Sequence, residues 1–406
     1  MKTLLACELR KILSRKVLWV VLALGVVMWV QVRGTGIVRE RLSGSTQGVK
    51  DVIAQYEGQV LTEALQARMK ESFESYVAAH GDRFIADPEP VGNDDSHWLP
   101  GEAATPYDQG VWVTYANLSG QMSLEDLRES QRMFQQMLTT GVDEQGMALS
   151  ADTRRSLNDR VRFFAATPMV RYAKGWEEFF RAPNENGLWV LLATVVALLG
   201  LFGGETSAHM DAIVLTARNR RRAVAAKLLA GAIVSGGSAV LFFGLQFAAQ
   251  AYAWGLQGAW LPASQVDIRY GSLPVAGVFA LSVLALVLDA VACGAIVAWA
   301  SARMRHVLLA LLAAGAILGG MALLGMDSGT ALQRQLRLLF SPYSPVLQMV
   351  DWFVYALPVN TLMENYPLAW NMSQAPTLIL HLALPAGLAV MLSWLSSRAF
   401  LRRRRA

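Results

Sequence analysis

The residues with the clearest capacity for chemistry lie between two long apolar segments. Glu205 and Thr206 stand directly after one segment, and Lys227 stands where the next begins. A hydroxyl at Thr206 can cap a short helix, and the Glu205 carboxylate can pair with nearby arginines. This pattern predicts a rigid, electrostatically locked elbow that transmits force from a soluble partner. The residues of this elbow that we single out are Glu205, Thr206, His209, Met210, Asp211, Arg218, Arg220, Arg221 and Arg222.

Motifs of enzyme chemistry are absent from the sequence. It contains no G-x-x-x-x-G-K-[ST] phosphate loop, no H-E-x-x-H and no G-x-S-x-G. His80 and His97 lie near Asp82, Asp94 and Asp95, a group in which zinc or copper could bind. Their spacing matches no known ligand pattern, so we favour solvated loop residues. We therefore expect no enzymatic activity, and no cofactor or metal bound by this chain.

The composition indicates a membrane protein. Of the 406 residues, 54% are hydrophobic and 17% are charged. Apolar residues gather in blocks of about 18 or more, long enough to cross a hydrocarbon core roughly 30 Å thick. A cleaved signal peptide is the rival interpretation of the first block, but no small-x-small cleavage site follows it cleanly. The six predicted spans are 17–32, 188–204, 228–254, 273–300, 307–325 and 377–395.

Lysine and arginine are distributed unequally between the loops that join these spans. Seventeen lie in the two terminal tails and in the loops after spans two and four, against three in the other two short loops. Because basic residues accumulate on the cytoplasmic side, both termini are predicted to be cytoplasmic. We expect an all-α membrane protein, with residues 1–16 as a cytoplasmic amphipathic helix. Residues 33–187 then form an extracytoplasmic domain between helices one and two, and 188–406 carry helices two to six.

The inserted domain is predicted to be mostly helical. Apolar residues between 49 and 77 recur at spacings of three and four, which predicts a first helix. Further helices are predicted at 124–138 and 152–164, with a loop at 81–110. Only residues 111–115 (VWVTY) show a strand-like pattern. The domain carries a net charge of −7 and the rest of the chain +12, so the basic balance reflects membrane-flanking arginines, not nucleic-acid binding.

Asp289 is a carboxylate inside the predicted span 273–300. A charge in a span is costly and usually faces the protein interior or a cavity. Two roles follow, gating of a transport path or a packing contact such as a hydrogen bond to a neighbouring span, and we favour the second. Glycines such as Gly231 and Gly236 in span three permit close helix packing.

Two local patterns resemble the permease subunits of type-two ABC exporters. Phe202-Gly203-Gly204-Glu205 closes a span, an amphipathic segment follows, and Arg222 and Lys227 lead into the next span. Residues 4–16 (LLACELRKILSRK) are similar to the amphipathic elbow helix that precedes the first span in this family. The resemblance covers the six-span frame and does not extend to the inserted domain.

The resemblance implies that the loop 205–227 forms a coupling helix that docks on a separate ATPase subunit. That partner would hold ATP and magnesium, and two permease subunits, identical or different, would form a dimer. It also implies short re-entrant helices between spans five and six, in 326–376. Residues 332–357, interrupted by Pro342 and Pro345, fit this role or that of an interfacial segment.

From this frame we expect an exporter in the bacterial cytoplasmic (inner) membrane. The expected substrate is an amphiphilic or peptide-like molecule that leaves the cytoplasm or the inner leaflet. The alternative is a non-transport protein of the same architecture, a sensor or mechanotransmission protein that acts on an extracytoplasmic partner. Both interpretations share the coupling loop.

Overall fold

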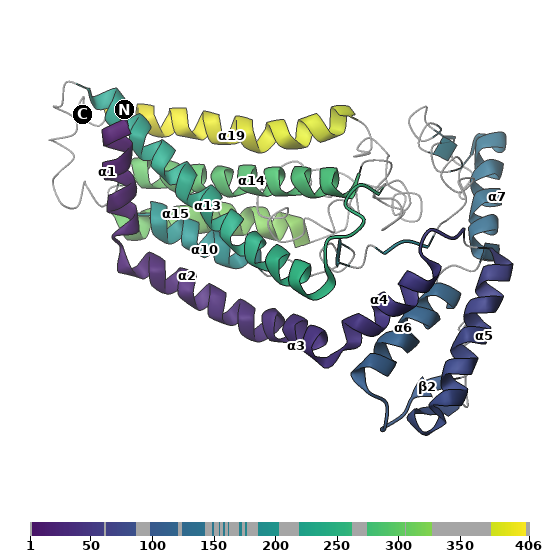
Figure 1. The fold of residues 1–406 in the computed structure, drawn as a ribbon. Helices are drawn as coiled ribbons and strands as arrows, with labels where there is room; N and C mark the ends of the chain where they lie inside the picture. The colour runs from purple at the N-terminus through teal and green to yellow at the C-terminus, as the bar shows by residue number, and fades with distance from the viewer. Residues whose placement is uncertain are drawn as a thin grey trace.

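A computed structural model places most of the chain in helices. The described residues are 2–60, 62–86, 98–120, 124–142, 148–149, 154, 157–158, 161, 170–172, 175–176, 186–202, 219–261, 274–304, 306–326 and 375–402. They form a bundle of long helices and a helical lobe beside one end of it, with helix α1 lying across the other end (Figure 1).

The bundle is made of helices from both halves of the sequence. α14 packs extensively against both α19 and α13, and α10 packs against α13 and α2. In the described part of the chain, three helical stretches are long and apolar enough to cross a membrane: 16–43, 220–254 and 275–303. Two further apolar helices, 188–198 and 307–318, are shorter. The helices of the bundle are α2 (Lys16–Trp29), α10 (Asn186–Leu198), α13 (Arg220–Trp254), α14 (Val275–Arg303), α15 (Val307–Met326) and α19 (Ala375–Arg402).

These helices differ from the predicted spans mainly at their ends. α2 does not stop at residue 32, because a π-helical turn, η1 (Val30–Gly34), carries it into α3 (Thr35–Ser43). The helix α10 ends at Leu198 and residues 199–202 form a turn, so the helix is shorter than the predicted span 188–204, whose last two residues lie outside the described residues. α13 begins at Arg220, eight residues before the predicted start of the span at residue 228.

The outside of the bundle is apolar. Val17, Leu24, Val240, Leu308 and Val390 are all exposed. Soluble proteins rarely expose apolar side chains over so long a surface. This surface is compatible with contact to lipid.

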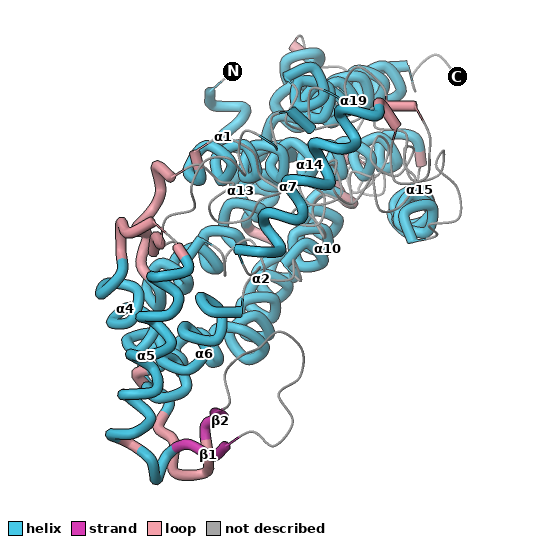
Figure 2. Tube along the Cα trace, turned by 90° about the vertical axis from the view of Figure 1, so that its right-hand side faces the viewer, coloured by secondary structure: helices cyan, strands magenta, loops and turns pink. Residues whose placement is uncertain are grey.

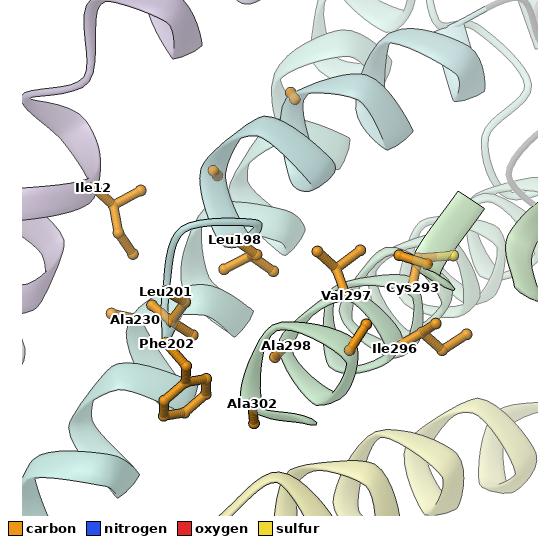
Figure 3. Packing of buried hydrophobic residues seen from close by; sticks show 14 of the residues in the cluster. Ile12, Leu198, Leu201, Phe202, Ala230, Cys293, Ile296, Val297, Ala298 and Ala302 are labelled. Atoms are coloured by element: carbon orange, nitrogen blue, oxygen red, sulfur yellow. The ribbon is translucent and has the colours of Figure 1, made fainter. Parts of the chain in front are cut away.

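The interior of the bundle is closely packed around Leu198. A Cβ atom added at Gly231 of α13 would lie 2.6 Å from Leu198, and one added at Gly294 of α14 would lie 2.9 Å from it. Figure 3 shows Leu198 with Val297 and Cys293 on one side and Ile12 of α1 on the other. Small residues therefore let α10, α13 and α14 approach closely.

Among the described residues, the lobe contains helices α4 to α7 and a small hairpin. α4 and α6 cross where glycines leave no room for a side chain, since a Cβ at Gly110 would lie 2.1 Å from the Ser45 carbonyl oxygen. The strands pair antiparallel, with Phe84 opposite Pro100, and lie at the end of the lobe away from the bundle (Figure 2). Its elements are α4 (Ser45–Tyr56), α5 (Glu63–Ala79), η2 (Gly81–Arg83), β1 (Phe84–Ala86), β2 (Trp98–Pro100), α6 (Pro106–Gly120) and α7 (Leu124–Thr140).

The strand-like pattern at 111–115 proved to be helical. Thr105 and Asp108 form a reciprocal capping box, in which each backbone N–H donates to the other side chain, at 2.7 and 3.2 Å. This box starts α6, and Val111 and Tyr115 then lie one turn apart on its buried face. Local β propensity is overridden by the cap and by core packing.

The helix predicted from residues 49 to 77 is divided into α4 and α5. Gly58 between them has φ of +81°, which ends a helix, and the Thr62 hydroxyl accepts a hydrogen bond from the Leu65 N–H to start the next. The helix predicted at 124–138 is present as α7. Most of the helix predicted at 152–164 lies outside the described residues, and the predicted loop 81–110 also contains the hairpin and the start of α6.

Candidate functional site

Helix α1 (Lys2–Leu13) lies across the end of the bundle at which α10 and α14 end and α13 and α15 begin (Figure 1). We name this end the base. The face of α1 that packs on the bundle carries Leu5, Leu9 and Ile12, which recur at spacings of three and four. Glu8 lies on the same face. The predicted amphipathic helix is therefore present, and it carries a carboxylate on its packed side.

That carboxylate pairs with a lysine from the middle of the chain. Nζ of Lys227 lies 3.1 Å from Oε1 and 3.1 Å from Oε2 of Glu8. The Lys227 side chain is only 1% exposed and that of Glu8 is 18% exposed. Because a buried charge is costly without a counter-charge, this ion pair holds α1 against the second turn of α13.

Arg15 makes a second tie, from the turn after α1 to the end of α10. Its Nη1 donates to the carbonyl oxygens of Ala197 at 2.8 Å and of Val196 at 3.4 Å. These carbonyls lack helical partners, and a cation at a helix C-terminus is favourable. Burial lowers the pKa of the Arg15 guanidinium, and the nearby Glu8 carboxylate opposes that effect.

The last residues before position 203 are fixed by α14 and α19. The Ser301 hydroxyl donates to the Leu199 carbonyl at 2.8 Å and accepts from the Phe202 N–H at 3.2 Å. The Phe202 ring packs on Phe400, with centroids 4.9 Å apart. In the described part of the chain, these contacts join α1, α10, α13, α14 and α19 at the base.

Three predicted elbow residues emerge from this junction. Arg220, Arg221 and Arg222 form the first turn of α13, and all three are exposed. Three positive charges at a helix N-terminus oppose the helix dipole. Their position is therefore better explained by a membrane surface or a partner than by helix stability.

The other elbow residues lie outside the described residues. These are Glu205, Thr206, His209, Met210, Asp211 and Arg218. The predicted outer segment 326–376 also falls almost wholly outside them. The proposed contact between Glu205 and the arginines therefore stays a prediction.

The ion pair between Glu8 and Lys227 was not predicted from the sequence, although both residues are charges among apolar neighbours. Glu8 lies at helical spacing among Leu5, Leu9 and Ile12, and Lys227 lies inside the apolar start of α13. A charge on an apolar face needs a partner. Each of the two charges therefore predicts that a partner exists, but the spacing does not say that the partner lies 219 residues away.

Asp289 lies in α14, away from the base. It is 4% exposed, one turn before the buried Cys293. No hydrogen bond or ion pair reaches its carboxylate within the part of the chain that the structure describes. Its gating or packing role stays a prediction.

The histidine cluster considered for metal binding is not assembled among the described residues. Nδ1 of His80 lies 2.9 Å from the Tyr76 carbonyl oxygen, and its ring stacks on the Tyr76 ring at 4.4 Å. Among the residues that the structure describes, no group of three or more His, Cys, Asp or Glu could hold a metal ion. His97, Asp94 and Asp95 lie outside them.

The far end of α13 belongs to the core of the lobe. Ala253 and Trp254 are buried there among residues of α4, α5 and α6. The Tyr172 hydroxyl donates to the Trp254 carbonyl at 2.6 Å, and a Cβ added at Gly175 would lie 2.1 Å from the Gly255 carbonyl oxygen. α13 is therefore joined to α1 at one end and to the lobe at the other.

Comparison with known proteins finds no relative of this chain. No family model, no curated protein and no solved structure matches it. A functional assignment therefore rests on the residues and their arrangement.

Proposed function

We propose that the chain is the membrane-spanning permease subunit of an ATP-driven exporter of the type-two ABC kind. It has six spans and cytoplasmic termini in a bacterial inner membrane, and it has no ATPase site of its own. It works as a dimer with a separate ATPase subunit that holds ATP and magnesium. The cargo is an amphiphilic or peptide-like molecule.

The observation that carries this proposal is the charge-linked base. The Glu8–Lys227 pair and the Arg15 contacts join α1, α10 and α13 on both sides of the segment 203–218. A partner that pushes on this segment or on Arg220–Arg222 would move the three helices together. Such a junction suits the entry of force from an ATPase.

The length of α13 supports transmission of that force outward. The helix has 35 residues without interruption, which at 1.5 Å per residue is about 52 Å. This exceeds a hydrocarbon core of roughly 30 Å. Because Ala253 and Trp254 lie in the core of the lobe, motion at the base reaches the extracytoplasmic side through α13 as well as through α2 and α3.

The long helix α13 also supports the alternative function, a mechanotransmission protein that acts on an extracytoplasmic partner. The two functions differ in whether cargo crosses the membrane. Movement of the lobe on ATP hydrolysis, without flux of any amphiphilic reporter through proteoliposomes, would select the alternative.

The proposal predicts that Glu8→Gln uncouples ATP hydrolysis from transport. The change removes the carboxylate that faces the buried Lys227 ammonium, and breaking such a pair costs about 3 kcal/mol. The complex, purified with its ATPase subunit and reconstituted, is assayed for substrate-stimulated hydrolysis and for flux. We expect ATP hydrolysis to continue and flux to fall at least about tenfold. A loss of about 1.4 kcal/mol in the coupling free energy is enough for a tenfold fall.

Arg10→Gln is the matched control, because Arg10 lies on the exposed face of the same helix. The double change Glu8→Lys with Lys227→Glu should restore part of the coupling. Full flux and full stimulation in Glu8→Gln would refute the role of the base. Failure of any ATPase subunit to co-purify with the wild-type chain would refute the permease assignment itself.

A further inference from the structure

Two cations gather at the outer end of α13, opposite the base. The Arg41 guanidinium of α3 lies 5.7 Å from the centroid of the Tyr252 ring, and its Nη1 donates to the Ala253 carbonyl at 3.4 Å. Nζ of Lys50 in α4 lies 6.0 Å from the centroid of the Tyr172 ring. We name Arg41, Lys50, Tyr172 and Tyr252 the outer collar.

The Arg41–Tyr252 contact and the Lys50–Tyr172 contact both lie at the end of α13. Tyr172 donates its hydroxyl hydrogen to the carbonyl oxygen of Trp254, two residues after Tyr252 on the same helix end. Burial lowers the pKa of the Lys50 ammonium, and the positive charge of Arg41 lowers it further. The two cations are therefore close enough to repel each other. The outer collar is therefore a single site with two like charges.

No carboxylate neutralises these charges among the residues that the structure describes. Asp51 is the neighbour of Lys50 in sequence, but its oxygens are used elsewhere. Oδ1 accepts from the Gln47 amide at 2.6 Å and Oδ2 accepts from the Tyr107 hydroxyl at 3.0 Å. Arg41 is exposed and Lys50 is partly buried. Two neighbouring cations without a counter-charge favour the binding of an anion.

The outer collar lies at the level expected for lipid headgroups. At 1.5 Å per residue, about 38 Å of helix separates Lys227 from Tyr252, and a bilayer with its headgroups is about 40–45 Å thick. Leu42, next to Arg41, is 74% exposed, and Trp260, in the turn after α13, is 84% exposed. Tyrosine and tryptophan concentrate at this level of a membrane.

We propose that the outer collar binds the phosphate of an anionic phospholipid, with Arg41 and Lys50 as the two cationic ligands. The exposed Leu42 and Trp260 lie against the apolar part of the same lipid layer. The inserted domain is otherwise acidic, with net charge −7, and an anionic membrane surface would repel it. A lipid bound at the outer collar fixes the lobe against the bilayer. This inference rests on the membrane placement in the proposed function, but not on export or on an ATPase.

The test measures lipid retention by the full-length protein. The protein is reconstituted in phosphatidylcholine vesicles with a rising fraction of phosphatidylglycerol, then released, and its bound lipids are counted by native mass spectrometry. Arg41→Gln and Lys50→Gln should each weaken phosphatidylglycerol retention about fivefold, and the double variant about thirtyfold. The charge-conserving Arg41→Lys and Lys50→Arg should retain it, which separates loss of binding from loss of folding.

Arg39→Gln is the matched control, because Arg39 is exposed and lies on the same helix two residues from Arg41. It should leave retention unchanged. Equal loss in Arg39→Gln and Arg41→Gln would overturn the proposal, because the attraction would then be diffuse. Equal retention of phosphatidylcholine, or displacement of the lipid by millimolar inorganic phosphate, would also overturn it.

Discussion

At the scale of single residues, two buried charges are held by specific partners. Glu8 and Lys227 show this at the base, and Asp108 shows it in the lobe. Asp108 is fully buried and accepts from the Thr105 N–H and hydroxyl at 2.7 and 2.6 Å, from the Tyr76 hydroxyl, and from Arg83 at 3.3 Å. Burial alone would raise the pKa of Asp108, but the hydrogen bonds from Thr105 and Tyr76, with the charge of Arg83, lower it overall.

The lowered pKa of Asp108 predicts acid sensitivity of the lobe. In the unfolded chain the Asp108 carboxyl has a pKa of about 3.9, so it binds a proton more readily there than in the folded protein. The stability that Asp108 contributes is therefore present above about pH 4 and is lost as pH falls through the folded pKa. Hydrogen exchange of α5 and α6, measured from pH 6 to pH 3, should show a steep loss of protection in the wild type.

Asp108→Asn is the comparison variant. It should lose about 1.5–3 kcal/mol of protection at pH 6, the usual worth of hydrogen bonds to a charged group. It should also show a shallower dependence on pH below 4. A wild type and a variant with the same pH dependence would show that Asp108 does not control the acid response.

At the scale of elements, the long apolar segments of the sequence correctly indicated the positions of the bundle helices, because the length of an apolar segment is a strong signal. The boundaries were less predictable, since they depend on local turns. Gly58 divides α4 from α5, and a capping box turns the strand-like residues 111–115 into helix. Pairing across the chain was also hidden, because nothing in the spacing of Lys227 names Glu8 as its partner.

Close packing of α10, α13 and α14 predicts that Gly294 tolerates no side chain. A Cβ at Gly294 would lie 2.5 Å from Ser235 Oγ and 2.9 Å from Leu198. Gly294→Ala should therefore destabilise the bundle by about 1–3 kcal/mol through overpacking. Thermal unfolding in detergent measures this as a lower midpoint.

Gly237→Ala is the matched control on α13, because a Cβ there would have nothing within 4 Å. Alanine also favours helix over glycine by about 1 kcal/mol. Gly237→Ala should therefore leave the midpoint unchanged or raise it. An equal loss in both variants would contradict the close packing of Leu198 and Ser235 against Gly294.

At the scale of the whole molecule, the two ends of the bundle are chemically different. The base presents Arg220, Arg221 and Arg222 beside the basic α1, and the lobe at the other end belongs to an acidic domain. The sequence predicted this polarity from composition alone, since charge asymmetry is a property of long segments. It did not predict that α13 joins the two ends, because that depends on the contacts of Tyr172 and Trp254.

This polarity predicts that the lobe and the base lie on opposite sides of the membrane. Asp82→Cys in the lobe and Asn219→Cys at the base both place a thiol at an exposed, described position. The natural Cys7 is exposed and must first become serine, whereas Cys293 is buried and can remain. In intact cells stripped of any outer barrier, an impermeant maleimide should label Asp82→Cys and leave Asn219→Cys unlabelled. In inside-out vesicles the result should reverse, because basic flanks stay in the cytoplasm. Labelling of both thiols from the same side would rule out the placement of the lobe and the base on opposite sides of the membrane, and with it the transmission of force along α13 from an ATPase at the base.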